Sequence, residues 1–350
     1  MTEPRCSPGQ LNRALLERQQ LLERSTEALP TVVERMGGIQ MQYAPAGYIG
    51  LWSRMRAFTR PMLTEALEAR QVVQATMLRA TIHTVSAADY WPMMAGIRRV
   101  NREWFSRVQA RELAGIDMPA AGRAVEAILA GGPLPMAELT AALESRGFPA
   151  RVAKSVGLWV DLVRVPPSGT WERRRADLYG LASWWLPPAE AVAEDDGIEL
   201  LIRRYLGAFG PAPLRDIASW MGLNVGQMRH VADRLELRPL RDGDGKPLLD
   251  LPDLQLPEED LPAPPRFLAV WDAALLVHAR RTQILPEAYR SLVFNTKTPH
   301  SVNTFLLDGQ VAGSWRYEDD EVRLSPFRPL PPPERASLED EAHRLAALHR

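Results

Sequence analysis

The chain has 350 residues, with 42 basic and 43 acidic side chains and a formal net charge of -1, which is not the basic balance expected of a nucleic-acid binder. It contains no apolar run of the roughly 18 residues that a membrane span needs, and its N-terminus lacks the apolar core of a signal peptide. The length predicts several modules, and the lone cysteine, Cys6, cannot form an internal disulfide, so we expect a cytoplasmic protein.

Residues 1–117 form the first predicted unit. Helical apolar spacing predicts helices over residues 11–22, 26–36, 50–58, 61–69 and 86–107. Two β-rich runs, at 72–76 and 81–85, predict a two-stranded wing, and Ser86 is placed to cap the helix that follows.

A glutamine triplet, Gln40-Met41-Gln42, follows the glycine pair Gly37-Gly38 within this unit. If the segment is extended, both amides point to the same side, because side chains alternate faces along a strand. Two amides can hold a water or a sugar oxygen, but they are not strong acids, strong bases or nucleophiles. The triplet therefore favours a reaction that needs orientation and dipoles, such as hydrolysis of an N-glycosidic bond whose base already carries a positive charge.

Two further units show the winged-helix pattern of helices followed by a hairpin. In residues 118–190, helices are expected at 120–130, 136–146 and 150–161, and strands at 162–165 and 170–174. In residues 191–251, helices are expected at 197–209, 214–221 and 225–237, with hairpin strands at 238–240 and 247–251. The acidic turn Asp242-Gly243-Asp244-Gly245 lacks the ligand spacing of a calcium loop.

The C-terminal part is predicted to be β-rich. A proline-rich, acidic linker at 252–265 precedes expected strands at 268–270, 291–294, 304–307 and 311–315, with a hairpin turn at Asp308-Gly309. We therefore predict an α+β, mainly helical fold in which tandem winged-helix units are followed by a small β-barrel at 252–326. Residues 327–350 are predicted to be a proline-rich tether and a terminal helix.

No motif for phosphate, dinucleotide or zinc binding is present, and the histidines are scattered, so we expect neither a metal nor a cofactor. His278 is expected to be a hydrogen-bonded core residue. His83 either contacts phosphate or fills the inner face of the wing. Tyr48 and Trp52 have the spacing of core residues, and base stacking is the alternative.

Several segments resemble the winged-helix bacterial DNA glycosylases of the azinomycin-resistance (AlkZ) and YcaQ type, over roughly residues 11–316. The segments that carry the resemblance are Gly38-Ile39-Gln40-Met41-Gln42, Gly47-Tyr48-Ile49-Gly50-Leu51-Trp52-Ser53-Arg54, Arg79-Ala80-Thr81-Ile82-His83, Val165-Pro166-Pro167-Ser168-Gly169-Thr170-Trp171, Arg204-Tyr205-Leu206 with Phe209-Gly210-Pro211-Ala212, and residues 267–281. Ala80 and Ile82 depart from the glycine and leucine usual in that family, and both changes are compatible with a strand.

The resemblance implies a monofunctional DNA glycosylase that hydrolyses the N-glycosidic bond of N7-alkylated, bulky or crosslinked purines, as self-resistance to a DNA-alkylating natural product. It assigns catalysis to Gln40 and Gln42, with double-stranded DNA as the partner of a monomer. The resemblance and the residue types expected on the inner surface together suggest a set of DNA contacts. These are Tyr48, Trp52, Arg54, Arg56, Arg79, His83, Arg173, Arg174, Arg175, Thr298 and His300.

The main alternative is a winged-helix transcriptional regulator without catalytic activity. A recognition helix at 225–237 would offer Gln227, Arg229 and His230 to base edges. A second alternative is a scaffold in which Gln40 and Gln42 only supply hydrogen bonds to a turn.

Overall fold

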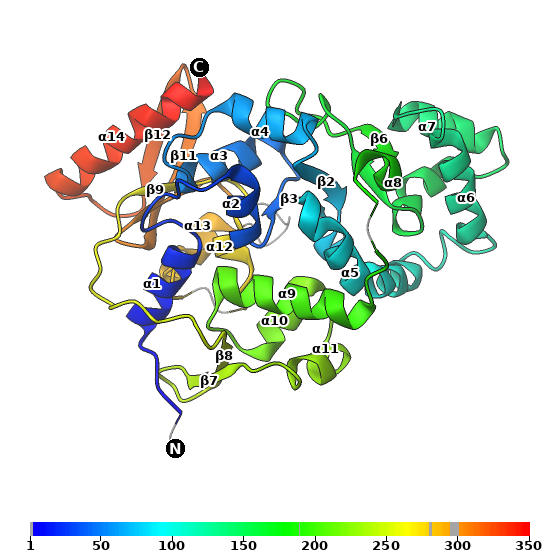
Figure 1. The fold of residues 1–350 in the computed structure, drawn as a ribbon. Helices are drawn as coiled ribbons and strands as arrows, with labels where there is room; N and C mark the ends of the chain where they lie inside the picture. The colour runs from blue at the N-terminus through cyan, green and yellow to red at the C-terminus, as the bar shows by residue number, and fades with distance from the viewer. Residues whose placement is uncertain (1–2, 189, 280–281, 295–300) are drawn as a thin grey trace.

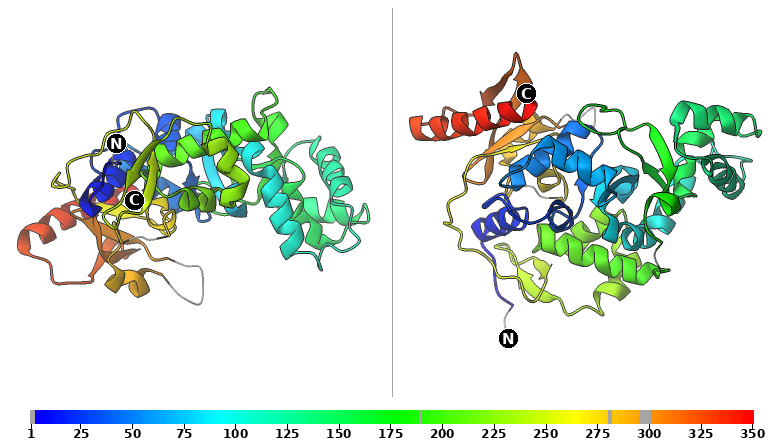
Figure 2. Two further views of the ribbon diagram at one scale, coloured as in Figure 1. Left: turned by 90° about the horizontal axis from the view of Figure 1, so that it is seen from below. Right: turned by 45° about the horizontal axis from the view of Figure 1, so that its top comes forward.

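A computed structural model describes residues 3–188, 190–279, 282–294 and 301–350. Its strands form one six-stranded, one four-stranded and one two-stranded sheet within these ranges. Helices α6 (Met118–Leu129) and α7 (Met136–Glu144) lie at one end of the molecule, and α14 (Pro332–His349) lies at the other (Figure 1). Two further views show the same separation (Figure 2).

The six-stranded sheet joins the first two predicted units. Its strands lie in the order β1-β3-β2-β5-β6-β4. Their bounds are Ile39–Gln40 for β1, Val72–Thr76 for β2, Ile82–Ser86 for β3, Leu134–Pro135 for β4, Leu162–Arg164 for β5 and Leu178–Leu181 for β6. The pairing of Gln74 with Arg164 links β2 of the first unit to β5 of the second. The predicted wings therefore belong to one sheet, with β1 at its edge.

The helices of the first unit pack around this sheet. They are α1 (Pro8–Arg18), α2 (Leu29–Arg35), α3 (Ala44–Arg54), α4 (Arg60–Glu68) and α5 (Ala87–Val108). The Ser86 side chain accepts a hydrogen bond from the Asp89 amide at 3.1 Å, which confirms the predicted cap of α5. Helix α3 begins earlier than predicted because Pro45, in its first turn, is compatible with a helix start.

The second unit departs from its prediction at two places. The helix expected at 150–161 is instead a pair of short 3₁₀ turns, Ala150–Lys154 and Val156–Leu158, because Ser155 and Gly157 weaken a continuous helix. The strand expected at 170–174 is part of a loop over residues 166–177, and β6 follows this loop. Helix α8 (Ala182–Trp185) completes the unit.

The third unit closely follows its prediction. It contains α9 (Glu194–Phe209), α10 (Leu214–Met221), α11 (Val225–Ala232) and a hairpin of β7 (Arg238–Arg241) with β8 (Pro247–Asp250). Gly222 adopts a φ of 81° directly after α10, as a turn glycine in that place requires.

The C-terminal sheet corrects the predicted barrel. It is an open four-stranded sheet in the order β12-β11-β10-β9, because four strands are too few to close around a packed interior. Its strands are β9 (Arg266–Leu268), β10 (Thr304–Leu307), β11 (Gln310–Glu318) and β12 (Glu321–Pro326).

Two other predicted features of this region are a hairpin turn, which is observed, and a strand, which is not. Asp308 and Gly309, with φ values of 44° and 76°, form the predicted hairpin turn. The strand expected at 291–294 is instead helix α13 (Arg290–Val293), and α12 (Ala273–Leu276) precedes it.

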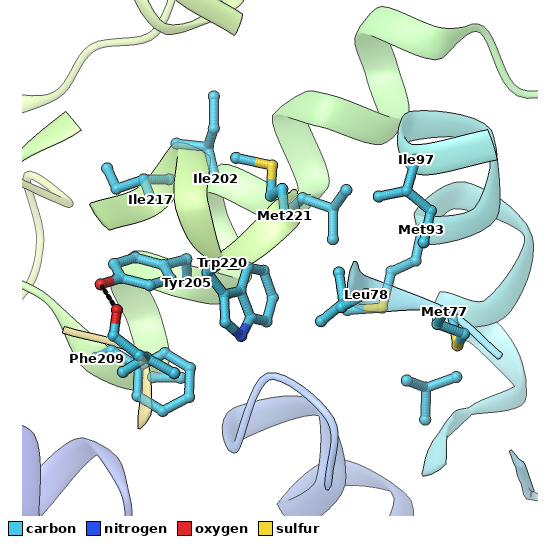
Figure 3. Packing of buried hydrophobic residues seen from close by; sticks show 14 of the residues in the cluster. Met77, Leu78, Met93, Ile97, Ile202, Tyr205, Phe209, Ile217, Trp220 and Met221 are labelled. Atoms are coloured by element: carbon cyan, nitrogen blue, oxygen red, sulfur yellow. Dashed lines mark hydrogen bonds between the residues drawn. The ribbon is translucent and has the colours of Figure 1, made fainter. Parts of the chain in front are cut away.

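The hydrophobic core does not divide along the predicted boundaries. One cluster runs from Leu15 through α5, α9 and α10 to Val311, and the rings of Tyr205, Phe209 and Trp220 meet within it (Figure 3). The second unit has a cluster of its own between α6, α7 and β6. The other boundaries remain a description of the sequence pattern.

Candidate functional site

The predicted glutamine pair lies at the edge strand of the six-stranded sheet. Gly37 and Gly38, with φ values of 71° and 83°, turn the chain out of α2 into β1. Gln40 pairs with His83 of β3, and the Met41 amide donates to the Ile82 carbonyl at 2.8 Å. The pairing keeps the triplet alongside β3 up to its middle residue.

Met41 anchors the triplet to the interior. Its side chain is buried, and its sulfur accepts a hydrogen bond from Thr84 Oγ1 at 3.0 Å. Helix α3 presses closely against it, since a Cβ atom at Gly47 would lie 2.5 Å from the sulfur. On either side of this buried residue, Gln40 is partly buried and Gln42 is exposed. This burial pattern agrees with the alternation expected of an extended segment.

The two glutamines have different hydrogen-bond partners. Gln42 Oε1 accepts a hydrogen bond from the Ile82 amide at 3.1 Å, so its side chain extends the ladder between β1 and β3. The Gln40 amide makes no hydrogen bond to any residue that the structure describes. It lines a narrow hollow with Gly38, Gly50 and Trp271. Gln40 is therefore the member of the pair whose side-chain amide has no partner among the described residues.

His83 lies opposite Gln40 but is buried, which corrects its assignment as a DNA contact. Its Nδ1 donates to the Thr81 carbonyl at 3.1 Å. Burial, with a smaller contribution from Arg79, lowers the pKa of His83 from 6.5 to about 3. The imidazole is therefore neutral at physiological pH and is packed within the fold, on the face of the sheet that it shares with Gln40, which agrees with the second of the two roles predicted for it.

Three other predicted DNA contacts are also corrected, because their side chains are buried. Tyr48 is enclosed, and its hydroxyl lies 2.8 Å from Thr64 Oγ1. The Arg24 guanidinium covers Trp52 at 4.8 Å from the ring centre. Arg54 forms a buried two-bond pair with the carboxylate of Asp272, at 2.8 and 2.9 Å. These buried side chains pack α3 against its neighbours, which for Arg54 include the C-terminal segment that carries Asp272.

The remaining predicted contacts fall into different settings. Arg56 is exposed and pairs with Glu23 at 2.8 Å. Arg79 is partly exposed, has a φ of 52°, and donates to the Trp220 carbonyl at 2.7 Å. Thr298 and His300 lie outside the described residues.

The loop over residues 166–177 presents the arginines predicted at 173–175. Ser168 organises it, since its hydroxyl accepts from the amides of Asp177 and Leu178 at 2.7 and 3.0 Å. Gln74 of β2 ties it to the sheet by donating to the Gly169 carbonyl at 2.8 Å. The Arg175 side chain is 85% exposed, so the loop carries positive charge outward from the same sheet that holds the glutamines.

Tyr43 is a candidate residue that sequence reasoning missed. It directly follows Gln42, its side chain is 41% exposed, and its hydroxyl accepts a hydrogen bond from Arg174 Nη1 at 3.0 Å. This contact brings the arginine loop to the glutamine pair. The only available signal was the position of an aromatic residue next to the triplet, and its exposure could not be inferred from that.

The recognition residues of the regulator alternative are largely engaged within the protein. Gln227 caps α11 by accepting from the Asn224 amide at 2.9 Å, and His230 Nε2 lies 2.9 Å from Asp195. Arg229 is exposed. One exposed arginine on a short helix is little support for base reading.

The described part of the chain lacks two further features. No group of three or more His, Cys, Asp or Glu side chains in it lies where it could hold a metal ion. No helix in it is both long and apolar enough to cross a membrane.

Comparisons with known proteins agree with this architecture. Among solved structures, the chain is similar to the Streptomyces sahachiroi DNA glycosylase AlkZ, with a TM-score of 0.83 and 21% identity over 99% of this chain and 97% of that chain. At this identity the likeness shows the fold alone. A search of curated proteins finds no match. The family model described as DNA glycosylase AlkZ-like matches residues 33–348. The chain therefore belongs to the AlkZ-like DNA glycosylase family and is a hydrolase that acts on N-glycosyl bonds in DNA.

Proposed function

We propose that this enzyme releases N7-alkylated purines, including bulky or crosslinked adducts, from double-stranded DNA, and that it provides self-resistance to a DNA-alkylating natural product. The observation that carries the proposal is the pair of neutral amides at the sheet edge, opposite a histidine that burial keeps uncharged. Such a site offers oriented dipoles and no strong acid. It therefore suits a base that needs no proton in order to leave.

Alkylation at N7 supplies the activation that the protein lacks. The alkylated purine is a cation, so the glycosidic bond breaks with the electron pair moving to the base, which departs neutral. Positive charge then builds on the deoxyribose, as in the oxocarbenium-like transition states of sugar hydrolysis. An amide carbonyl fixed near that charge stabilises it by about 3 kcal/mol, the size found for single preorganised dipoles in other active sites.

Gln40 and Gln42 take different parts in this proposal. Gln40, whose amide has no hydrogen-bond partner among the described residues, turns its carbonyl oxygen toward the sugar and accepts a hydrogen bond from the attacking water. The water adds to C1′ and loses a proton to solvent. Gln42 uses one lone pair of Oε1 for the Ile82 amide, which fixes its orientation beside the water.

Binding of the duplex is assigned to arginines near the glutamine strand. The candidates that reach the surface are Arg56, Arg79, Arg173, Arg174 and Arg175. Arg174 also holds Tyr43 beside Gln42. We propose that a monomer binds one duplex and that the contacts are mainly to phosphate, since guanidinium groups suit bidentate phosphate contacts.

The direct test is single-turnover release of N7-methylguanine from a duplex by wild type, Gln40→Ala and Gln42→Ala. We expect each variant to be at least about tenfold slower, equivalent to about 1.4 kcal/mol or more, while its affinity for DNA is retained. We expect the larger loss for Gln40→Ala, because its amide is the one available to water.

Gln255→Ala, at an exposed glutamine in the linker, is the matched control and should behave as wild type. Wild-type rates in both site variants would reject the assignment of the glutamines. A duplex carrying an N7 crosslink, scored in parallel for alkali-labile breaks, tests whether bulky adducts are substrates.

A further inference from the structure

Trp271 occupies a strained backbone position at the glutamine site. It lies between β9 and α12, and its φ is 58°, in the left-handed region that a bulky side chain rarely adopts. Such strain persists only where the surrounding structure imposes it, and it concentrates at functional sites.

Several independent contacts impose the conformation. The Trp271 amide donates to Ser301 Oγ at 2.8 Å, and the Val270 amide donates to Asn303 Oδ1 at 2.9 Å. On the other side, Asp272 accepts from the Ala274 amide at 3.0 Å and carries the buried ion pair with Arg54. The backbone of Trp271 is therefore held from both neighbours.

This segment and Gln40 line the same narrow hollow. Its lining also includes Gly38 and the small residues Ala46 and Gly50 of α3. Trp271 is partly exposed. The hollow is too narrow to admit a purine or a sugar, so a nucleotide meets Gln40 and Trp271 only at its rim.

We propose that the Trp271 indole contacts the deoxyribose of the damaged nucleotide and stabilises the positive charge that develops on it. This inference rests on the proposed function. Tryptophan is the aromatic side chain that attracts cations most strongly over its face. At the rim of the hollow, Gln40 then supplies an oxygen dipole to the sugar and Trp271 supplies a π face, so both interactions strengthen as the glycosidic bond breaks.

The test uses two abasic-site mimics in the same duplex: a pyrrolidine sugar analogue that is protonated, and a neutral tetrahydrofuran analogue. We expect wild type to prefer the cationic mimic. Trp271→Phe and Trp271→Leu form a matched pair, because both keep an apolar side chain at the same strained backbone position and only one is aromatic. We expect the preference for the cationic mimic to fall about tenfold in Trp271→Leu and by no more than about threefold in Trp271→Phe.

Affinity for the neutral mimic should stay within about twofold of wild type in both variants, since that mimic carries no charge for the indole to attract. Trp271→Gly relieves the backbone strain and removes the ring, so its thermal unfolding midpoint separates loss of fold from loss of contact. Trp184→Leu, at an exposed tryptophan of α8, is the control for losing an indole elsewhere.

The outcomes separate the two proposals. If wild type releases no alkylated purine and shows no preference for the cationic mimic, the proposed function fails. If wild type does both, and Trp271→Leu keeps the same preference or falls equally with Trp271→Phe, only the role of Trp271 is overturned. A slower release by Trp271→Leu with an unchanged affinity for undamaged duplex supports the contact.

Discussion

At the scale of single residues, the glutamine site depends on which side chains are excluded from water. Met41 is buried, whereas Gln40 at the end of the edge strand is partly buried and Gln42 just beyond it is exposed. His83 is also buried, and the cost of charging it there lowers its pKa to about 3. The site therefore contains amides and a neutral imidazole, which makes its pH dependence a direct test.

We expect the single-turnover rate of release to be constant between about pH 5 and 9, because neither glutamine titrates and His83 is already neutral in that range. The stability of the protein, in contrast, should begin to fall within the acidic part of this range. The pKa of His83 is about 3 in the fold and 6.5 ordinarily, so the unfolded chain binds more protons and stability falls as pH drops from 6.5 toward 3.

The test measures, across the pH range, the rate of base release from one alkylated duplex and the thermal unfolding midpoint of the protein. A sigmoidal rate profile with a midpoint near 6.5, without a change in the thermal midpoint, would show that a titrating group participates in the reaction. A matched series with Gln42→Glu, which introduces a titratable carboxylate at the pair, should instead show a rate that changes with pH around the ordinary pKa of that group, about 4.3.

At the scale of elements, the buried pair of Arg54 and Asp272 connects α3 to the segment that carries Trp271. Both oxygens of Asp272 accept from Arg54, which also donates to the Gly50 carbonyl at 3.1 Å. This pair places the C-terminal segment against the helix that follows the glutamines. Losing one partner leaves the other charge buried and unpaired.

We expect Asp272→Asn to destabilise the protein by about 3–5 kcal/mol, as found for broken buried pairs. Asparagine can still cap α12, so the loss of stability measures the effect of removing the charge and not of removing the cap. The thermal unfolding midpoint measures it, with Asp308→Asn, at an exposed carboxylate, as the control. Equal midpoints for the two variants would mean that the buried pair contributes little. The double variant with Arg54→Met should lose less than the sum of the single losses.

How far the sequence predicts these elements depends on burial. Strand β2 and helix α10 were predicted at their observed bounds, because each has a clear apolar pattern between turn residues. Helix α3 is buried over its whole length. The spacing of Tyr48 and Trp52 indicates core residues, but no local pattern shows that Arg54 also faces inward. The partner of Arg54 is 218 positions away, and no local pattern predicts such a pair. The same limit hid Trp271, because its conformation depends on residues 301 and 303.

At the scale of the whole molecule, attraction to DNA is expected from a local group of arginines, because the total charge of the chain is not basic. The net charge is -1, yet the loop at 166–177 presents arginines beside the glutamine strand. Attraction to phosphate depends on such local fields and weakens as salt rises. The salt dependence of binding therefore reports which arginines meet the duplex.

We expect Arg175→Ala and Arg173→Ala each to lower the slope of log affinity against log salt by about one. Binding to undamaged duplex at several salt concentrations measures the slope. Arg335→Ala, on α14 at the far end of the molecule from α6 and α7, is the control and should leave the slope unchanged (Figure 1). A slope that responds to Arg335 and not to Arg175 would place the duplex on another face.

The pairing of β2 with β5 connects the first and second units through one continuous sheet. A continuous hydrogen-bonded sheet joins the edge strand to the loop on Gln74, so we expect the two to move together and not to close around the target. We then expect the double helix to change shape on binding, and stretches that kink easily to be bound preferentially. Lesions that loosen base stacking lower the cost of that deformation, so mechanical softness of the DNA contributes to target choice alongside the chemistry of the leaving base.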